Sequence, residues 1–294
     1  MNCPICRGPQ LSTLYCINTY DIVACGRCGG WSVPAVLRTE LEETSASYSA
    51  DYLKRGEGQG AQLSGYYDYE AERGLHLKNF QQNLEILAQH VTGPRLLDVG
   101  CATGHFLEAA AQAGYQVMGT DISETAVQHV REKLHFPAVA GDILRLNLEE
   151  RFDVISLWET VEHLTRPAAV LHKLRSWLRP GGVLVIGTGD NTSLLARWMG
   201  ARWWYLTPPD HVLYYNPRAL GLLLNECELE VDAWHRIRFH WVSSRNVVMK
   251  LLRSFRLPPA QVLTWSKRMP LLPLPILHNT TMVAVARHQK VRLR

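Results

Sequence analysis

The sequence contains no long apolar run and no strong excess of one charge. None of its apolar stretches approaches the roughly 18 residues that a membrane-spanning helix requires. Its first residues, MNCPICRG, include no apolar core of a signal peptide. The formal net charge of +4 over 294 residues is too small to require nucleic acid or an anionic membrane as a partner. We therefore expect a cytoplasmic protein, in which the seven cysteines stay reduced.

Two Cys-x-x-Cys pairs stand near the N-terminus. Cys3 and Cys6 form the first pair and Cys25 and Cys28 the second, with 18 residues between the pairs. This spacing is typical of a tetrahedral zinc site with four thiolate ligands. A unit of residues 1–33 is too small for a hydrophobic core of its own, so we expect the zinc to be structural.

Residues 34–78 form a polar stretch punctuated by glycine and serine. The stretch predicts either a solvated linker or an aromatic flap over a ligand, because it contains five tyrosines: Tyr48, Tyr52, Tyr66, Tyr67 and Tyr69. Apolar residues then recur at helical spacing from residue 77 to 91, which predicts an amphipathic helix.

Strand-like and helical patterns alternate after this helix. Strands are predicted at residues 95–99, 116–120, 138–140, 152–157 and 183–188. Helices are predicted between them at residues 105–113, 124–134 and 168–178. This order predicts an α/β fold with a doubly wound, mostly parallel, Rossmann-like sheet. Ligands of such sheets bind at the carboxyl ends of the strands.

Acidic residues follow the first three strands of this sheet. The first strand ends in Asp98-Val-Gly100-Cys-Ala102-Thr-Gly104. A carboxylate two residues before the first glycine would repel a pyrophosphate, but it suits a ligand with a cationic end. Asp121 can bind the hydroxyls of a ribose, and Asp142 can accept from an adenine amine. A ribose, an adenine and a cationic end without phosphate describe S-adenosylmethionine.

These acids, the run FDVISLWETVEHL at residues 152–164 and LRPGGV at 178–183 resemble class I S-adenosylmethionine-dependent methyltransferases. The resemblance covers roughly residues 79–287, and we take residues 79–294 as the methyltransferase domain. It implies a seven-stranded sheet with an antiparallel last strand at residues 281–286. The cofactor-binding residues that it implies are Asp98, Gly100, Cys101, Gly104, Asp121, Ile122, Asp142, Ile143 and Trp158.

The sequence departs from the family pattern at two positions where many members carry glycine. Ala102 is small enough that we expect cofactor binding to survive. Glu228 follows a predicted helix at 217–227, where a left-handed cap costs a non-glycine residue about 1 kcal/mol. We therefore expect this helix end to be built differently.

Few side chains are candidates for a general base. His211 lies in PPDHVLYYN, a segment that resembles the substrate-side H-x-x-Y-Y segment of similar methyltransferases, with Tyr214 or Tyr215 as pocket wall. His163, after the fourth strand, is a second candidate, because histidine titrates near neutral pH. The alternatives are that His163 only orders its loop and that His211 only packs locally. The tryptophans of residues 194–206 line a substrate pocket or lid, or simply pack.

A helical insertion is predicted at about residues 240–278. Within it, residues 244–256 form a basic amphipathic pattern, which suits a membrane surface, an acidic substrate, or an ordinary solvated helix.

The leading hypothesis is O-methylation of a small molecule, a sugar or another secondary metabolite. One alternative is an RNA or protein methyltransferase that uses the zinc ribbon as a substrate grip. Nucleic acid is disfavoured because Arg7 and Arg27 are the only basic residues of the ribbon. Another alternative is a non-catalytic scaffold that binds S-adenosylmethionine. The oligomeric state is not predicted.

Overall fold

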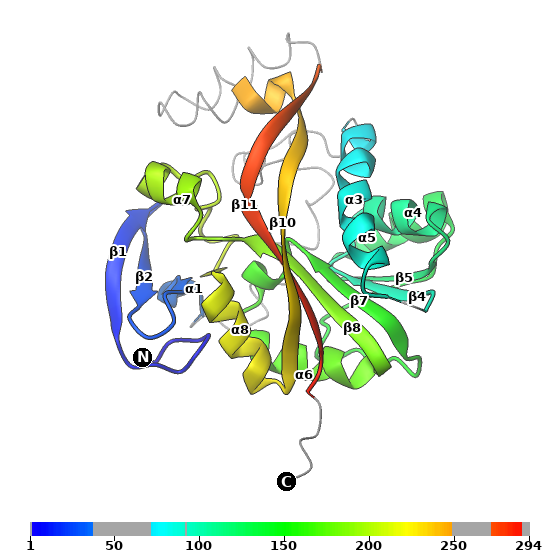
Figure 1. Ribbon diagram of the computed structural model, residues 1–294, viewed down its shortest axis with the longest axis horizontal. Coiled ribbons are helices and arrows are strands. Elements are labelled where there is room, and N and C mark those ends of the chain that lie inside the picture. Colours follow the sequence, from blue (N-terminus) through cyan, green and yellow to red (C-terminus); the bar gives the residue numbers. More distant parts are fainter. Residues whose placement is uncertain (1, 38–71, 92, 249–271, 290–294) are drawn as a thin grey trace.

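The computed structural model describes residues 2–37, 72–91, 93–248 and 272–289 (Figure 1). The five tyrosines of the predicted linker or flap lie outside these residues. Among the described helices, none has the length and apolar character needed to cross a bilayer.

A seven-stranded sheet forms the centre of the molecule, in the order β10-β11-β8-β7-β4-β5-β6. Its five parallel strands are β4 (Arg95–Val99), β5 (Gln116–Asp121), β6 (Ala138–Ala140), β7 (Phe152–Trp158) and β8 (Leu178–Gly189). Strand β11 (Pro273–His288) runs antiparallel to both of its neighbours, β8 and β10 (Leu229–Ser243), so β10 has the same direction as the five parallel strands. The predicted Rossmann-like fold is confirmed, including its antiparallel last strand.

Helices cover both faces of this sheet. One face packs on α3 (Arg73–Ala88), α4 (His105–Gln112) and α5 (Glu124–His129), which a π-helical turn, Val130–Leu134, continues. The other face packs on α6 (Pro167–Trp177) and α8 (Pro217–Glu226). Successive residues of β8 alternate between these cores: Val185 joins the first and Ile186 the second. This alternation explains why the parallel strands are apolar on both faces.

The N-terminal residues form a second sheet that includes a strand from much later in the sequence. Its order is β1 (Leu11–Ile17), β2 (Tyr20–Cys25), β3 (Trp31–Ser32) and β9 (Leu213–Tyr214). A short helix, α1 (Pro34–Leu37), follows β3. Figure 1 shows this N-terminal unit beside α7 (Leu194–Met199) and α8. The cysteine ribbon is therefore joined by backbone pairing to the segment that carries His211.

The predicted helical insertion at residues 240–278 is wrong at both of its ends. Residues 240–243 belong to β10 and residues 273–278 to β11, and these parts pair from Ser243↔Pro273 to Phe239↔Leu277. Helix α3 supports this extension through side-chain amides. Asn79 exchanges two hydrogen bonds with the backbone of Trp241, at 2.7 and 2.9 Å, and Gln82 donates to the Phe239 carbonyl. Residues 244–248 are helical, and residues 249–256 lie outside the described residues.

Two non-glycine residues adopt left-handed backbone conformations where relatives often carry glycine. Ala102 has a φ of 47° and Glu228 a φ of 58°. The expectation that the end of α8 is built differently is therefore wrong. Glu228 keeps the left-handed cap, and its carboxylate lies 2.5 Å from the guanidinium of Arg175.

We predict that Glu228→Gly raises the free energy of unfolding by about 1 kcal/mol relative to Glu228→Ala. Both variants lose the Arg175 ion pair, and only glycine also relieves the left-handed conformation. Urea unfolding of the two variants would measure the difference. Equal stabilities would contradict a strained cap at this position.

Candidate active site

Three acids lie at one edge of the sheet. Strands β4, β5 and β6 are parallel neighbours, and their carboxyl ends meet at this edge. Asp98 is the penultimate residue of β4, Asp121 ends β5, and Asp142 follows β6 by two residues. The structure thus brings together the three acids that the sequence predicts.

Asp98 is buried, with only 3% of its surface exposed. The hydroxyl of Ser156 on the neighbouring strand β7 donates a 2.7 Å hydrogen bond to its carboxyl group. Burial raises the pKa of Asp98 to about 8, against the effect of that hydrogen bond. A cationic ligand group beside this carboxyl would favour its ionised form and lower its pKa.

Asp121 holds the glycine loop to the end of β5. Its two carboxylate oxygens accept from the backbone N–H groups of Ala102 and Ser123, each at 2.9 Å. Burial nevertheless raises the pKa of Asp121. Asp142 accepts from the N–H of Leu144 at 2.9 Å.

The loop between β4 and α4 needs glycine at two positions. Gly100 and Gly104 have φ values of 76° and 85°. A β-carbon at Gly100 would lie 2.5 Å from the Thr160 hydroxyl oxygen, and one at Gly104 would lie 2.7 Å from Leu134. These close contacts leave the backbone of the loop, rather than its side chains, to face a ligand.

The remaining predicted cofactor residues differ in what they can offer. The Cys101 side chain is buried against Gly119, so Cys101 can reach a ligand only through its backbone. Ile122 is partly exposed and Ile143 is buried, each directly after an acid. The ring of Trp158 packs on Gly187.

Several buried polar atoms near the strand ends have no hydrogen-bond partner among the described residues. They are Oγ1 of Thr103, Oγ1 of Thr120 and Nε1 of Trp158. Buried polar groups are normally paired. Together with the acids and the open backbone of the loop, these atoms fit a polar ligand such as S-adenosylmethionine.

A second polar cluster surrounds Glu162, which is fully buried. Its carboxylate accepts from the Thr188 hydroxyl at 2.9 Å and from the phenolic hydroxyl of Tyr205. The Tyr205 hydroxyl also accepts from the N–H of Gly189, at the end of β8. Tyr205 was not predicted as a site residue. It lies in residues 194–206, whose tryptophans were predicted to line a pocket or lid, or to pack.

His163 and His211 lie beside Glu162, with ring centroids 4.7 Å apart. Nδ1 of His163 is 2.8 Å from the Asp210 carbonyl oxygen, and Nδ1 of His211 is 2.8 Å from the Tyr205 carbonyl oxygen. A carbonyl oxygen only accepts, so Nδ1 carries the hydrogen in both rings and Nε2 is the basic nitrogen of the neutral form. Burial, and next the charge of His163, lower the pKa of His211. His211 is therefore neutral near pH 7 and has a lone pair to accept a proton.

Tyr214 lies behind His211. It is fully buried, and its hydroxyl donates to the His211 carbonyl at 3.0 Å. Burial raises its pKa far above the ordinary value. Its position suits support of the His211 turn, which differs from the predicted pocket wall. The tryptophans of the same segment differ in exposure: Trp203 is buried and Trp198 is 83% exposed.

The four N-terminal cysteines converge on one point. Their sulfur atoms all lie within 4.8 Å of one another, with Cys3–Cys28 at 3.8 Å and Cys6–Cys25 at 3.6 Å. A tetrahedral zinc ion with Zn–S bonds of about 2.3 Å requires sulfur–sulfur distances of about 3.8 Å. The geometry therefore fits zinc.

A second set of ligating atoms occurs in the candidate active site. One carboxylate oxygen of Glu162 and one ring nitrogen each of His163 and His211 lie within 4.8 Å of one another. Imidazole and carboxylate groups in this number suit a divalent transition metal.

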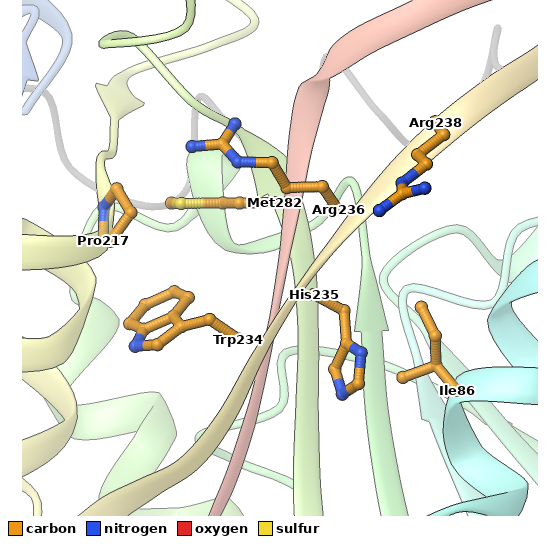
Figure 2. Close-up of a pocket in the computed structure, with 7 residues that line it drawn as sticks. All are labelled: Ile86, Pro217, Trp234, His235, Arg236, Arg238 and Met282. Atoms are coloured by element: carbon orange, nitrogen blue, oxygen red, sulfur yellow. The ribbon is translucent and has the colours of Figure 1, made fainter.

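A hollow of about 560 Å³ lies along the outer edge of β10, away from the three acids (Figure 2). Figure 2 shows Trp234 and Arg236 on one side of the strand and His235 and Arg238 on the other. Arg236 is fixed by the buried carboxylate of Asp190, at 2.6 Å. This groove follows a sheet edge between α3 and α8, and it is distinct from the cluster around Glu162.

The family described as "Methyltransferase domain" matches residues 69–233, which is more than half of the chain. The chain therefore belongs to this methyltransferase-domain family.

Two curated relatives are both named ubiquinone biosynthesis O-methyltransferase. The protein of Haemophilus ducreyi is 36% identical over 120 residues, which cover 37% of this chain and 51% of the relative. The protein of Methylococcus capsulatus is 25% identical over 222 residues, covering 68% of this chain and 93% of the relative. The chain thus spans about half the length of some curated relatives that it matches.

Solved structures share the fold at low sequence identity. A magnesium protoporphyrin IX methyltransferase from Synechocystis PCC 6803 aligns with a TM-score of 0.53 and 15% identity, over 85% of this chain and all of that one. An S-adenosylmethionine-dependent methyltransferase from Thermotoga maritima aligns with a TM-score of 0.50 and 16% identity, over 74% of this chain and 93% of that one.

Proposed function

We propose that the chain transfers a methyl group from S-adenosylmethionine to an oxygen of a small molecule or glycan. The observation that carries this proposal is the placement of the paired histidines beside the strand-end acids. Burial raises the pKa of Asp121, and the charge of His163 is near enough to this acid to oppose that rise in part. Membership of the methyltransferase-domain family supports the reaction class. The names of the curated relatives favour oxygen as the acceptor atom.

The three acids and the glycine loop would hold the cofactor. In this arrangement, Asp98 would bind the amino group of the methionine part, Asp121 the ribose hydroxyls and Asp142 the adenine amine. Backbone at Gly100 and Gly104 allows close approach. When bound, the cofactor supplies an electrophilic methyl group, and the protein supplies alignment.

His211 would act as the general base. Its Nε2 would take the proton of the acceptor hydroxyl, so that the oxygen could accept the methyl group that the cofactor would supply. The buried carboxylate of Glu162 stabilises the imidazolium that forms, because the two groups lie within 4.8 Å. His163 shares this position and is the second candidate.

We predict that His211→Ala lowers turnover by about 100-fold or more, while the affinity for S-adenosylhomocysteine stays within a factor of about three. The measurement incubates radiolabelled S-adenosylmethionine, the purified protein and a cell extract. The label is then divided among small-molecule, lipid, polysaccharide, RNA and protein fractions. The matched control is His172→Ala, since His172 is exposed on α6.

Unchanged turnover in His211→Ala would remove His211 as the base. Label found only in RNA or protein would favour the ribbon as a substrate grip. Cofactor binding with no label in any fraction would favour a non-catalytic scaffold.

The raised pKa of Asp98 generates a second prediction. A carboxyl with a pKa of about 8 is mostly protonated at pH 6 to 7. An amino group that binds beside it must displace that proton. Affinity for S-adenosylhomocysteine should therefore rise with pH up to about 8, by at most about tenfold per unit. Asp98→Asn should bind more weakly and lose this dependence. Calorimetry at several pH values tests both points, and the same slope in Asp98→Asn would disprove the assignment.

We infer that the four cysteines hold one structural zinc ion and that this ion supports the His211 segment. Asn216 donates to the Cys28 carbonyl at 3.4 Å, and Asn191 donates to the Gly29 carbonyl at 3.1 Å. These carbonyls belong to the second cysteine turn. The same Asn191 amide donates to the Tyr214 carbonyl at 3.3 Å. Order in the cysteine turn is thereby coupled to the backbone beside His211.

An aromatic chain makes the same connection. Trp31, next to the second cysteine turn, contacts Trp203 at a centroid distance of 6.3 Å. Trp203 stacks on Tyr205 at 5.0 Å, and Tyr205 contacts His211 at 4.3 Å. Disorder in the ribbon would therefore reach the candidate base.

We predict that Cys28→Ser reduces bound zinc and raises hydrogen exchange of the amides in residues 205–216, with little change in cofactor affinity. Cofactor affinity should change little because the acids proposed to bind the cofactor lie on other strands than the His211 segment. Elemental analysis and exchange mass spectrometry provide the measurements. Cys16→Ser is the control, since Cys16 is exposed and outside the cluster. Zinc retained in full, or exchange unchanged after zinc loss, would refute the proposed support.

A further inference from the structure

The small net charge of the chain conceals a strong segregation of charge along the sequence. The last acidic residue is Asp232. Residues 1–232 carry 19 Lys and Arg against 27 Asp and Glu, a net charge of −8. Residues 233–294 carry 12 Lys and Arg and no acid, a net charge of +12. Such asymmetry indicates an anionic partner for the basic part.

Exposed apolar side chains gather on α7 and at the outer ends of β10 and β11. Eight large apolar residues are exposed among the described residues, and six of them lie on α7, at the outer ends of β10 and β11, or directly before β11. We call this region the tip; its apolar residues are Leu194, Trp198, Phe239, Leu272, Leu274 and Leu277. Leu194 and Trp198 are one helical turn apart on α7, with 80% and 83% of their surfaces exposed, and Leu277 is 70% exposed. Side chains this exposed protrude into solvent. They add nothing to the stability of the isolated protein.

The tip lies at the same edge of the sheet as the three acids. β11 runs antiparallel to β8, and its Thr281 pairs with Gly189, the last residue of β8. The residues of β11 before Thr281 therefore extend beyond the carboxyl end of β8. Figure 1 shows this extension rising above the sheet, with α7 beside β11, and α7 contacts β11.

Exposed arginines, and no acids, neighbour the protruding side chains in the sequence. The sequence has no acid between Asp190 and Asp210, or after Asp232. Arg197 and Arg202 are exposed on and after α7, and Arg238 is exposed on β10. The tip thus combines four leucines, a tryptophan, a phenylalanine and arginines.

We propose that the tip docks on an anionic membrane surface. Leucine and tryptophan side chains enter the boundary between headgroups and acyl chains, and arginines contact the lipid phosphates. Aliphatic protrusions favour lipid over RNA, which is bound through aromatic stacking platforms. Their convex exposure favours lipid over a second protein, whose interface packs to the density of a protein interior. Docking in this way would turn the edge that carries the three acids toward the membrane.

Vesicle flotation with the full chain tests this proposal. The chain should float with vesicles that contain phosphatidylglycerol, and the bound fraction should fall at high salt and with pure phosphatidylcholine. The double variant Leu194→Ser/Trp198→Ser should lower the partition coefficient at least about tenfold, because two large apolar groups no longer enter the bilayer. Arg197→Glu/Arg238→Glu should lower it by a similar factor. The matched control is Leu14→Ser, an exposed leucine on β1.

Affinity for S-adenosylhomocysteine verifies that each variant is folded. Absence of binding to anionic vesicles at low salt would overturn the proposal. Equal flotation of the wild type and the Leu194→Ser/Trp198→Ser variant would do so too. A dimer in sedimentation velocity that this variant abolishes would assign the tip to a second copy of the chain. RNA binding that the same variant abolishes would assign it to nucleic acid.

Discussion

The backbone pairing of β3 with β9 is the interaction on which the candidate active site depends. It joins Trp31 to Tyr214 and Ser32 to Leu213, and the N–H of Val33 adds a bond to the Val212 carbonyl. Strand β9 has only two residues, so the segment that carries His211 needs further attachment beside this pairing. The buried amides of Asn191 and Asn216 complete the attachment, because they bind the cysteine turn and each other.

The polar cluster around Glu162 is stable for a related reason. A fully buried carboxylate is costly unless its oxygens are paired. The hydroxyls of Thr188 and Tyr205 provide that pairing, and the Tyr205 carbonyl in turn fixes the ring of His211. Glu162 therefore orders the proposed base indirectly, and its charge would compensate the proton that His211 would take up. Stability and the proposed proton transfer would depend on the same contacts.

The local pattern of the sequence was sufficient for the central sheet and for the acids at its edge. Strands at residues 95–99 and 138–140 have the predicted limits, because each is a short apolar run bounded by turn residues. The attachment of the ribbon could not be predicted, since it joins residues 188 positions apart, such as Cys28 and Asn216. Tyr205 was missed for the same reason. Glu228 keeps a left-handed conformation although it is not glycine. The free-energy cost of that conformation does not predict the backbone where the surrounding packing fixes it.

The net charge of the whole chain does not predict the charge around the extended β10 and β11. Averaged over the chain, the charge is +4 and suggests no partner. Divided at Asp232, the same residues give an acidic part and a basic part that differ by 20 charges, −8 against +12. Screening at physiological ionic strength acts over about 8 Å, so a surface responds to the local charge and not to the sum. An approaching anionic surface would therefore meet the arginines and protruding leucines of the tip, which lie at the edge of the sheet where Asp98, Asp121 and Asp142 are placed.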